Sequence, residues 1–146
     1  LGERAGNAPI EELVAAAAVG EEPVNLDVSR DRLLPTTRGV LDALDEDVNA
    51  AKPLLGAEAF THESGLHTAA MLEDPATFEP FDPERFSGSR RLVFGDATGR
   101  GAARKLLERA GRDPTAARVD RLLDRLSSAD GELSLDDAVA AADDVA

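Results

Sequence analysis

Residues 60–67 read Phe60-Thr61-His62-Glu63-Ser64-Gly65-Leu66-His67 and contain both histidines of the chain. The Ser-Gly pair at the centre predicts a turn, because serine side chains bond to nearby backbone groups and glycine adopts conformations that other residues avoid. The apolar residues of 69–72 follow at once and favour a short helix. We therefore expect His67 near the start of this helix.

Outward from this stretch, apolar spacing predicts a mainly α fold of about five to six helices with one short strand at 92–94. Asn7 is the expected N-cap of the first helix, with Pro9 in its first turn and Gly20 at its end. Ser29 or Asp31 is the expected cap of the second, with Pro35 near its first turn. The expected apolar stripes are Ile10, Leu13, Val14 and Ala17; Leu33, Leu34, Thr37, Leu41 and Leu44; Ala103, Leu106, Leu107 and Ala110; Val119, Leu122, Leu123 and Leu126; Leu135, Ala138, Val139 and Ala142.

The stretch 73–90 is rich in proline, aspartate and serine but also contains Phe78, Phe81 and Phe86. Three aromatic rings favour an ordered loop over a flexible linker. The whole pattern predicts two helical parts, residues 1–52 and 53–146.

The charge composition excludes some classes of partner. Asp and Glu total 29 against 16 Lys and Arg, for a net charge of −13, and Lys52 and Lys105 are the only lysines. Such a surface repels phosphate, so nucleic-acid binding is disfavoured. High acidity with few lysines favours adaptation to high salt over simple solubility, because concentrated salt screens the repulsion between carboxylates. A further interpretation of the acidic composition is a protein that mimics nucleic acid. Such a protein concentrates its negative charge on one face, whereas here the charge is spread over every helix.

Other absences limit the chemistry. The sequence has no cysteine, which excludes disulfides and thiolate metal sites. It has no apolar run of about 20 residues and no secretory signal, so we expect no membrane contact and a cytoplasmic location.

The local motifs do not point to a metal or phosphate site. His62 and His67 lie five residues apart, whereas two zinc ligands on one helix face need a spacing of four, so hydrogen-bonding histidines are the simpler interpretation. An EF-hand with its glycine at Gly131 would place Leu126 at the first ligand position, where a carboxylate is required. The glycine-rich stretch 95–101 lacks the Gly-Lys-Ser/Thr of a P-loop, so a turn entering a helix is favoured there, with Arg100 as the one candidate ligand contact.

Four strings, in order, carry a family resemblance: Leu-Gly-Glu-Arg-Ala-Gly-Asn at 1–7, the His62–His67 string, Asp-Pro-Ala-Thr-Phe-Glu-Pro-Phe-Asp-Pro at 74–83, and Gly99-Arg100. Together they resemble the acyl-CoA-dependent Claisen-condensing enzymes, the 2-isopropylmalate, homocitrate and citramalate synthases. The resemblance implies the C-terminal region that follows a (β/α)8 catalytic barrel, with the barrel absent from this chain. Residues 1–52 would then be the end-of-barrel loop and a helical subdomain I, and 53–146 a lid and dimerisation subdomain II.

The resemblance also implies roles for individual residues. His67 would be catalytic and would handle a proton through water together with Glu3, while Asn7, Ser64 and Phe78 would lie at the substrate. Phe78 departs from the tyrosine that the family often carries at this position. The glycine-rich stretch departs further, because Asp96 and Ala97 stand where Lys and His are common.

The implied reaction joins acetyl-CoA to a 2-oxo acid, with a tilt toward homocitrate-type substrates. A divalent metal (Mg, Mn or Zn) would be bound by the missing barrel and none by this chain, which alone would be inactive. A homodimer is implied, because the family's histidine reaches into the partner subunit's active site. The alternative is a stand-alone acidic helical module that binds a protein partner and has no chemistry.

Overall fold

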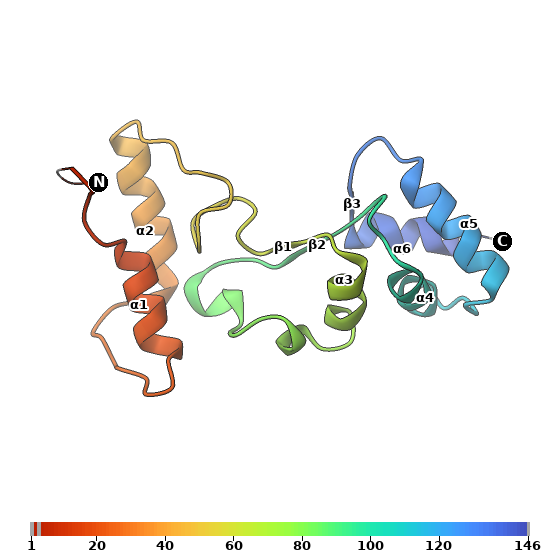
Figure 1. Cartoon of the computed structure of the whole chain (residues 1–146), viewed down its shortest axis with the longest axis horizontal. Coiled ribbons are helices and arrows are strands. Elements are labelled where there is room, and N and C mark those ends of the chain that lie inside the picture. The colour runs from red at the N-terminus through yellow and green to blue at the C-terminus, as the bar shows by residue number, and fades with distance from the viewer. Residues whose placement is uncertain (1, 3, 146) are drawn as a thin grey trace. The chain divides into compact units, whose positions relative to one another are not determined.

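The computed structural model describes residue 2 and residues 4–145, which form two compact units (Figure 1). Unit 1 comprises Leu1–Phe60 and Pro80–Ser89, and unit 2 comprises Thr61–Glu79 and Arg90–Ala146. The predicted division between residues 52 and 53 therefore falls inside unit 1. Each unit has its own hydrophobic core.

The described residues are mainly helical, which confirms the predicted fold class. The single predicted strand at 92–94 is present, and two strands of two residues each accompany it. Unit 1 contains α1 (Ile10–Val19), α2 (Arg30–Ala43) and the 3-10 turn η2 (Pro83–Phe86). Unit 2 contains β1 (Thr61–His62), α3 (Gly65–Met71), the 3-10 turn η1 (Pro75–Thr77), β2 (Arg91–Phe94), α4 (Arg100–Arg109), α5 (Ala116–Ser127), β3 (Leu133–Ser134) and α6 (Leu135–Asp143).

Helix α1 ends at Gly20, as predicted, but buries a different face. Ile10 and Leu13 are more than half exposed, whereas the buried residues are Glu11, Val14, Ala15 and Ala18. These four have the same helical spacing as the predicted stripe, shifted by one residue. The shift is stabilised by an ion pair, because the Glu11 carboxylate meets the Lys52 ammonium at 2.8 Å. The start also differs from the prediction, since Pro9 occupies the N-cap position in place of Asn7.

Helix α2 begins after Ser29, as predicted, but contains Pro35 beyond its first turn. Proline has no backbone N–H, so the carbonyl of Asp31, four residues earlier, loses its helical partner. The Ser87 hydroxyl donates a hydrogen bond of 2.6 Å to this carbonyl. A loop residue of unit 1 thus satisfies the acceptor that proline leaves free.

The segment 80–89 belongs to unit 1 because its aromatic rings pack there. Phe86 is fully buried in the unit 1 core, and the Phe81 ring meets it edge-on at 5.3 Å between centroids. Phe81 also contacts Phe60 in the same way. This packing explains why the compact units do not follow a single cut in the sequence, and it agrees with the ordered loop predicted for 73–90.

The three short strands of unit 2 form one sheet in the order β1-β2-β3. Strand β1 runs parallel to β2, with His62 opposite Leu92, and β3 runs antiparallel to β2, with Leu133 opposite Phe94. The parallel pairing brings His62 beside the beginning of β2.

The core of unit 2 is formed mainly by α4, α5 and α6, whose predicted apolar stripes are largely buried; Phe94 is fully buried among them. Ser134 caps α6 by accepting a hydrogen bond from the backbone N–H of Asp137. Gly111, with φ +71°, follows the end of α4.

Candidate functional site

The candidate site is built around His67, which lies in the first turn of α3. The helix starts there because Ser64 occupies the N-cap position and the Gly65 N–H donates to the Ala97 carbonyl at 3.1 Å. A Cβ on Gly65 would lie 2.3 Å from the Gly99 backbone nitrogen, so only glycine permits this close approach. The predicted Ser-Gly turn therefore fixes the position of the His67 backbone in the first turn of α3.

Phe78 is the nearest aromatic neighbour of His67. The two ring centroids lie 4.1 Å apart with the planes tilted by 35°, which is stacking contact. Phe78 directly follows η1, a turn capped by the Asp74 carboxylate accepting from the Ala76 N–H. Phe78 is itself 37% exposed, so one part of this ring pair is open to solvent.

His62 is a second ring neighbour of His67, with its ring centroid 6.4 Å from that of His67. Its Nε2 is 3.7 Å from Oε1 of Glu79, within reach of an ion pair when the imidazole is protonated. Burial lowers the pKa of His62, and the nearby His67 and Arg90 lower it further, while Glu79 acts in the opposite direction.

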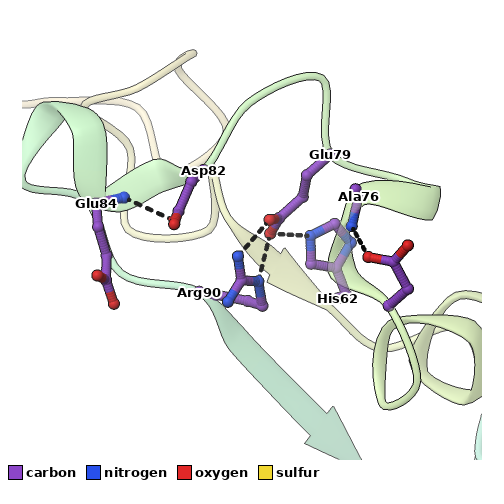
Figure 2. A network of polar contacts seen from close by, with 7 residues as sticks. His62, Ala76, Glu79, Asp82, Glu84 and Arg90 are labelled. Atoms are coloured by element: carbon purple, nitrogen blue, oxygen red, sulfur yellow. Dashed lines mark hydrogen bonds and ion pairs between the residues drawn. The ribbon is translucent and has the colours of Figure 1, made fainter.

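Glu79 and Arg90 form a bidentate ion pair next to His62 (Figure 2). The Glu79 side chain is only 6% exposed. Neither residue was singled out from the sequence, although Glu79 lies within the Asp74–Pro83 string and Arg90 just before the predicted strand. A charged residue next to a proline-rich turn is usually solvated, so no local signal indicates its burial.

The other predicted site residues have varied surroundings. Ser64 is exposed, and its carbonyl accepts from the Thr68 hydroxyl at 3.1 Å. Asn7 lies in unit 1, where a Cβ on Gly2 would come within 3.0 Å of its side chain, so the Gly2 backbone approaches Asn7 closely. Glu3 lies outside the described residues.

The glycine-rich stretch enters α4, with Gly99 at the N-cap position. Arg100, the first helical residue, forms an ion pair with Asp120. Within the described part of the chain, no group of three or more His, Asp or Glu side chains is arranged to hold a metal ion. The described helices are all too short or too polar to cross a bilayer.

Comparison with known proteins matches residues 54–132 to the family model described as homocitrate synthase post-HMGL domain-like. A homocitrate synthase of Frankia alni is 46% identical over 112 residues, which is 76% of this chain and 31% of that protein. Homocitrate synthase AksA of Methanopyrus kandleri is 38% identical over 130 residues, covering 88% of this chain and 32% of that protein.

A protein named as an (R)-citramalate synthase, from Methanoculleus marisnigri, is 38% identical over 126 residues, which is 86% of this chain and 25% of that protein. The chain thus spans about a quarter to a third of the length of these relatives. The matched family model covers both histidines, Phe78 and the Glu79–Arg90 pair. The chain therefore belongs to the family of homocitrate, citramalate and 2-isopropylmalate synthases, within which residues 54–132 are its post-HMGL domain-like region.

Proposed function

We propose that this chain is the helical C-terminal region of an acyl-CoA-dependent condensing synthase and supplies a proton-transferring histidine, His67, to the active site. The observation that carries the proposal is the ring arrangement around His67. Phe78 stacks on this imidazole and His62 flanks it, yet no described residue makes a hydrogen bond with its side chain. Neither ring nitrogen is therefore occupied by a hydrogen bond to a described residue, which supports a role in exchanging protons with water or substrate.

The chemistry proposed for the full-length enzyme requires such a group. Acetyl-CoA loses a methyl proton to a base, the resulting enolate carbon bonds to the ketone carbon of a 2-oxo acid, and the alkoxide formed takes up a proton. Water then cleaves the thioester and releases the CoA thiol. A neutral imidazole can accept a proton and return it, which is why histidine serves general acid–base steps at neutral pH.

The remaining predicted roles complete this proposal. Glu3 would relay a proton through water with His67 of the other subunit, and Asn7, Ser64 and Phe78 would contact the substrate. The divalent cation that would polarise the ketone is proposed to be bound by the barrel. The chain alone is accordingly proposed to be inactive and to act within a homodimer.

The test is CoA-thiol release by the full-length synthase in concentrated KCl with Mg²⁺ or Mn²⁺, offered pyruvate, 2-oxoisovalerate and 2-oxoglutarate in turn. We expect turnover with one of the three acids, homocitrate chemistry requiring 2-oxoglutarate. His67→Ala should lower kcat by at least about tenfold, because general acid–base catalysis contributes about 100-fold or more.

Leu66→Ala is the matched control, since this side chain is adjacent, 74% exposed and without chemistry. Unchanged kcat in a folded His67→Ala enzyme would refute the role of His67. No release with any of the three acids would favour the alternative, a protein-binding module.

A further inference from the structure

The Glu79–Arg90 pair is more tightly defined than an ordinary surface ion pair. Arg90 Nε donates to Oε1 of Glu79 at 2.8 Å, and Nη2 donates to Oε2 at 2.6 Å. Two parallel charge-assisted bonds fix both the carboxylate and the guanidinium plane. Because the Glu79 carboxylate is almost completely buried, losing its cation would leave an uncompensated charge, which strongly favours the paired geometry.

This pair joins the two segments that flank His67. Glu79 directly follows Phe78, whose backbone N–H bonds to the Pro75 carbonyl of η1 at 3.2 Å. Arg90 directly precedes β2, the strand to which His62 is paired through β1. The contact between Glu79 and Arg90, which Figure 2 shows beside His62, therefore links the residue that follows Phe78 to the strand pair of His62.

The orientation of the His67 imidazole depends on these neighbours. Since no described residue forms a hydrogen bond with the ring, packing against Phe78 and His62 is what restricts its rotation within this unit. A hydrogen bond from the protein would fix the ring more firmly but would occupy a nitrogen that proton transfer needs. Packing occupies neither nitrogen. It orients the His67 ring only if the rings of Phe78 and His62 are themselves held in place.

We propose that Glu79 and Arg90 are positioning residues for His67, acting through Phe78 and His62. The geometric part of this proposal concerns the fold of unit 2 alone. Its catalytic consequence rests on the proposed function, in which His67 transfers a proton. Positioning matters for such a step because a displacement of about 1 Å can cost a reaction about 100-fold in rate.

The geometric test is NMR of the 146-residue chain, which has only two histidines to assign. In the unchanged protein the Phe78 ring current should shift the His67 ring protons, and NOEs should connect the two rings. Glu79→Gln keeps the side-chain size and removes the charge. We expect it to weaken those NOEs at least twofold and to move the His67 shifts toward unfolded values.

Arg90→Lys keeps the positive charge but lacks the planar fork, so we expect the same spectral change from it. This second variant decides the matter if Glu79→Gln does not fold, because it leaves the buried carboxylate with a cation. The effects of Glu79→Gln and Arg90→Gln on His67 should combine to less than their sum in the double variant, because the two residues share the contact between them.

Arg125→Gln is the matched control. It removes an arginine–carboxylate contact of 2.9 Å to Asp144 in the same unit, but one that is largely exposed. The His67 ring signals should not change in this variant. Unchanged His67–Phe78 NOEs and shifts in folded Glu79→Gln and Arg90→Lys proteins would overturn the proposal.

The catalytic test uses the full-length synthase. Arg90→Lys should lower kcat by about tenfold, with KM for acetyl-CoA changed less than about twofold, because misplacing a proton-transfer group affects the reaction more than binding. The pH profile of kcat should shift as well, whereas a general loss of stability would lower the amount of active enzyme without moving the profile.

The catalytic role of His67 and the positioning role of Glu79 and Arg90 can be refuted independently. Unchanged ring signals in the 146-residue variants refute the positioning role whatever the activity of the enzyme. Unchanged kcat in His67→Ala refutes the proposed function, and the NMR result then still decides whether Glu79 and Arg90 hold the ring.

Discussion

At the scale of single residues, the candidate site consists of His67, the Phe78 ring that contacts it, and the backbone and charged groups around the two histidines. Phe78 retains an aromatic ring at the position where the family often carries tyrosine, and that ring stacks on His67. The tight approach at Gly65 and the buried Glu79 carboxylate show that the positions around the histidines are constrained by backbone spacing and by charge.

His62 should make the stability of the chain depend on pH. Its pKa lies below the ordinary 6.5, mainly because it is partly buried, so the folded protein disfavours the charged form more than the unfolded chain does. Its contribution to stability should be complete above pH 6.5 and be lost as the pH falls through the lowered pKa of the folded state. Urea unfolding of the wild type between pH 7.5 and 5.5 measures this loss.

His62→Gln is the comparison for that titration, because glutamine is polar but does not ionise in this range. His67 remains in both proteins and so does not account for a difference between them. A variant whose free energy of unfolding falls as steeply as that of the wild type over this interval would contradict the assignment to His62.

At the scale of elements, α1 shows how a helix can be predicted correctly and oriented incorrectly. Residues 14–19 are all alanine or valine. The predicted buried face, which begins at Ile10, and the observed one, which begins at Glu11, therefore have the same residue spacing, and both contain Val14. The tertiary packing of Val14, Ala15 and Ala18 in the unit 1 core decides between them, and the Lys52 ammonium group, which also meets Glu12, compensates the charge of Glu11 on the inner face.

Two matched truncations test this orientation. Val14→Ala removes a side chain that is 4% exposed and should lower the free energy of unfolding by about 2 kcal/mol. Leu13→Ala removes a larger side chain that is 55% exposed and should change it by less than about 0.5 kcal/mol. Urea unfolding followed by circular dichroism measures both, and a larger effect at Leu13 would restore the originally predicted face.

At the scale of the whole molecule, the net charge of −13 is the dominant feature. Repulsion between like charges opposes the folded state, and the screening length falls from about 10 Å at 0.1 M salt to about 3 Å at 1 M. We therefore predict that the melting temperature rises between 0.1 M and 2 M KCl, in keeping with the predicted adaptation to high salt.

A variant with fewer exposed carboxylates separates charge screening from other effects of salt. Glu21→Gln, Glu22→Gln, Asp27→Asn and Asp47→Asn together remove four negative charges from exposed positions. This protein should gain less melting temperature from KCl than the wild type does. An equal gain in both proteins would show that screening of these charges is not the cause.

The two units also show why the predicted division at residue 52 differs from the compact units. Phe81 and Phe86 lie on a segment that leaves unit 2 and packs in the core of unit 1. Nothing in the local composition of 80–89 indicates which core its rings join. Only contacts with distant residues, such as Phe60, determine it.

The amino-acid sequence by itself determined the helices, the turn that precedes His67 and the candidate histidine. The helices and the turn follow from local rules, namely apolar spacing, capping residues such as Ser134, and glycine at helix ends such as Gly111, whereas the choice of His67 follows from the family resemblance. The tertiary structure decided the two-residue strands, the inner face of α1 and the burial of Glu79 with Arg90. A two-residue strand has no periodicity, and an ion pair between distant positions has no local signature, because each depends on which segments the folded chain brings together.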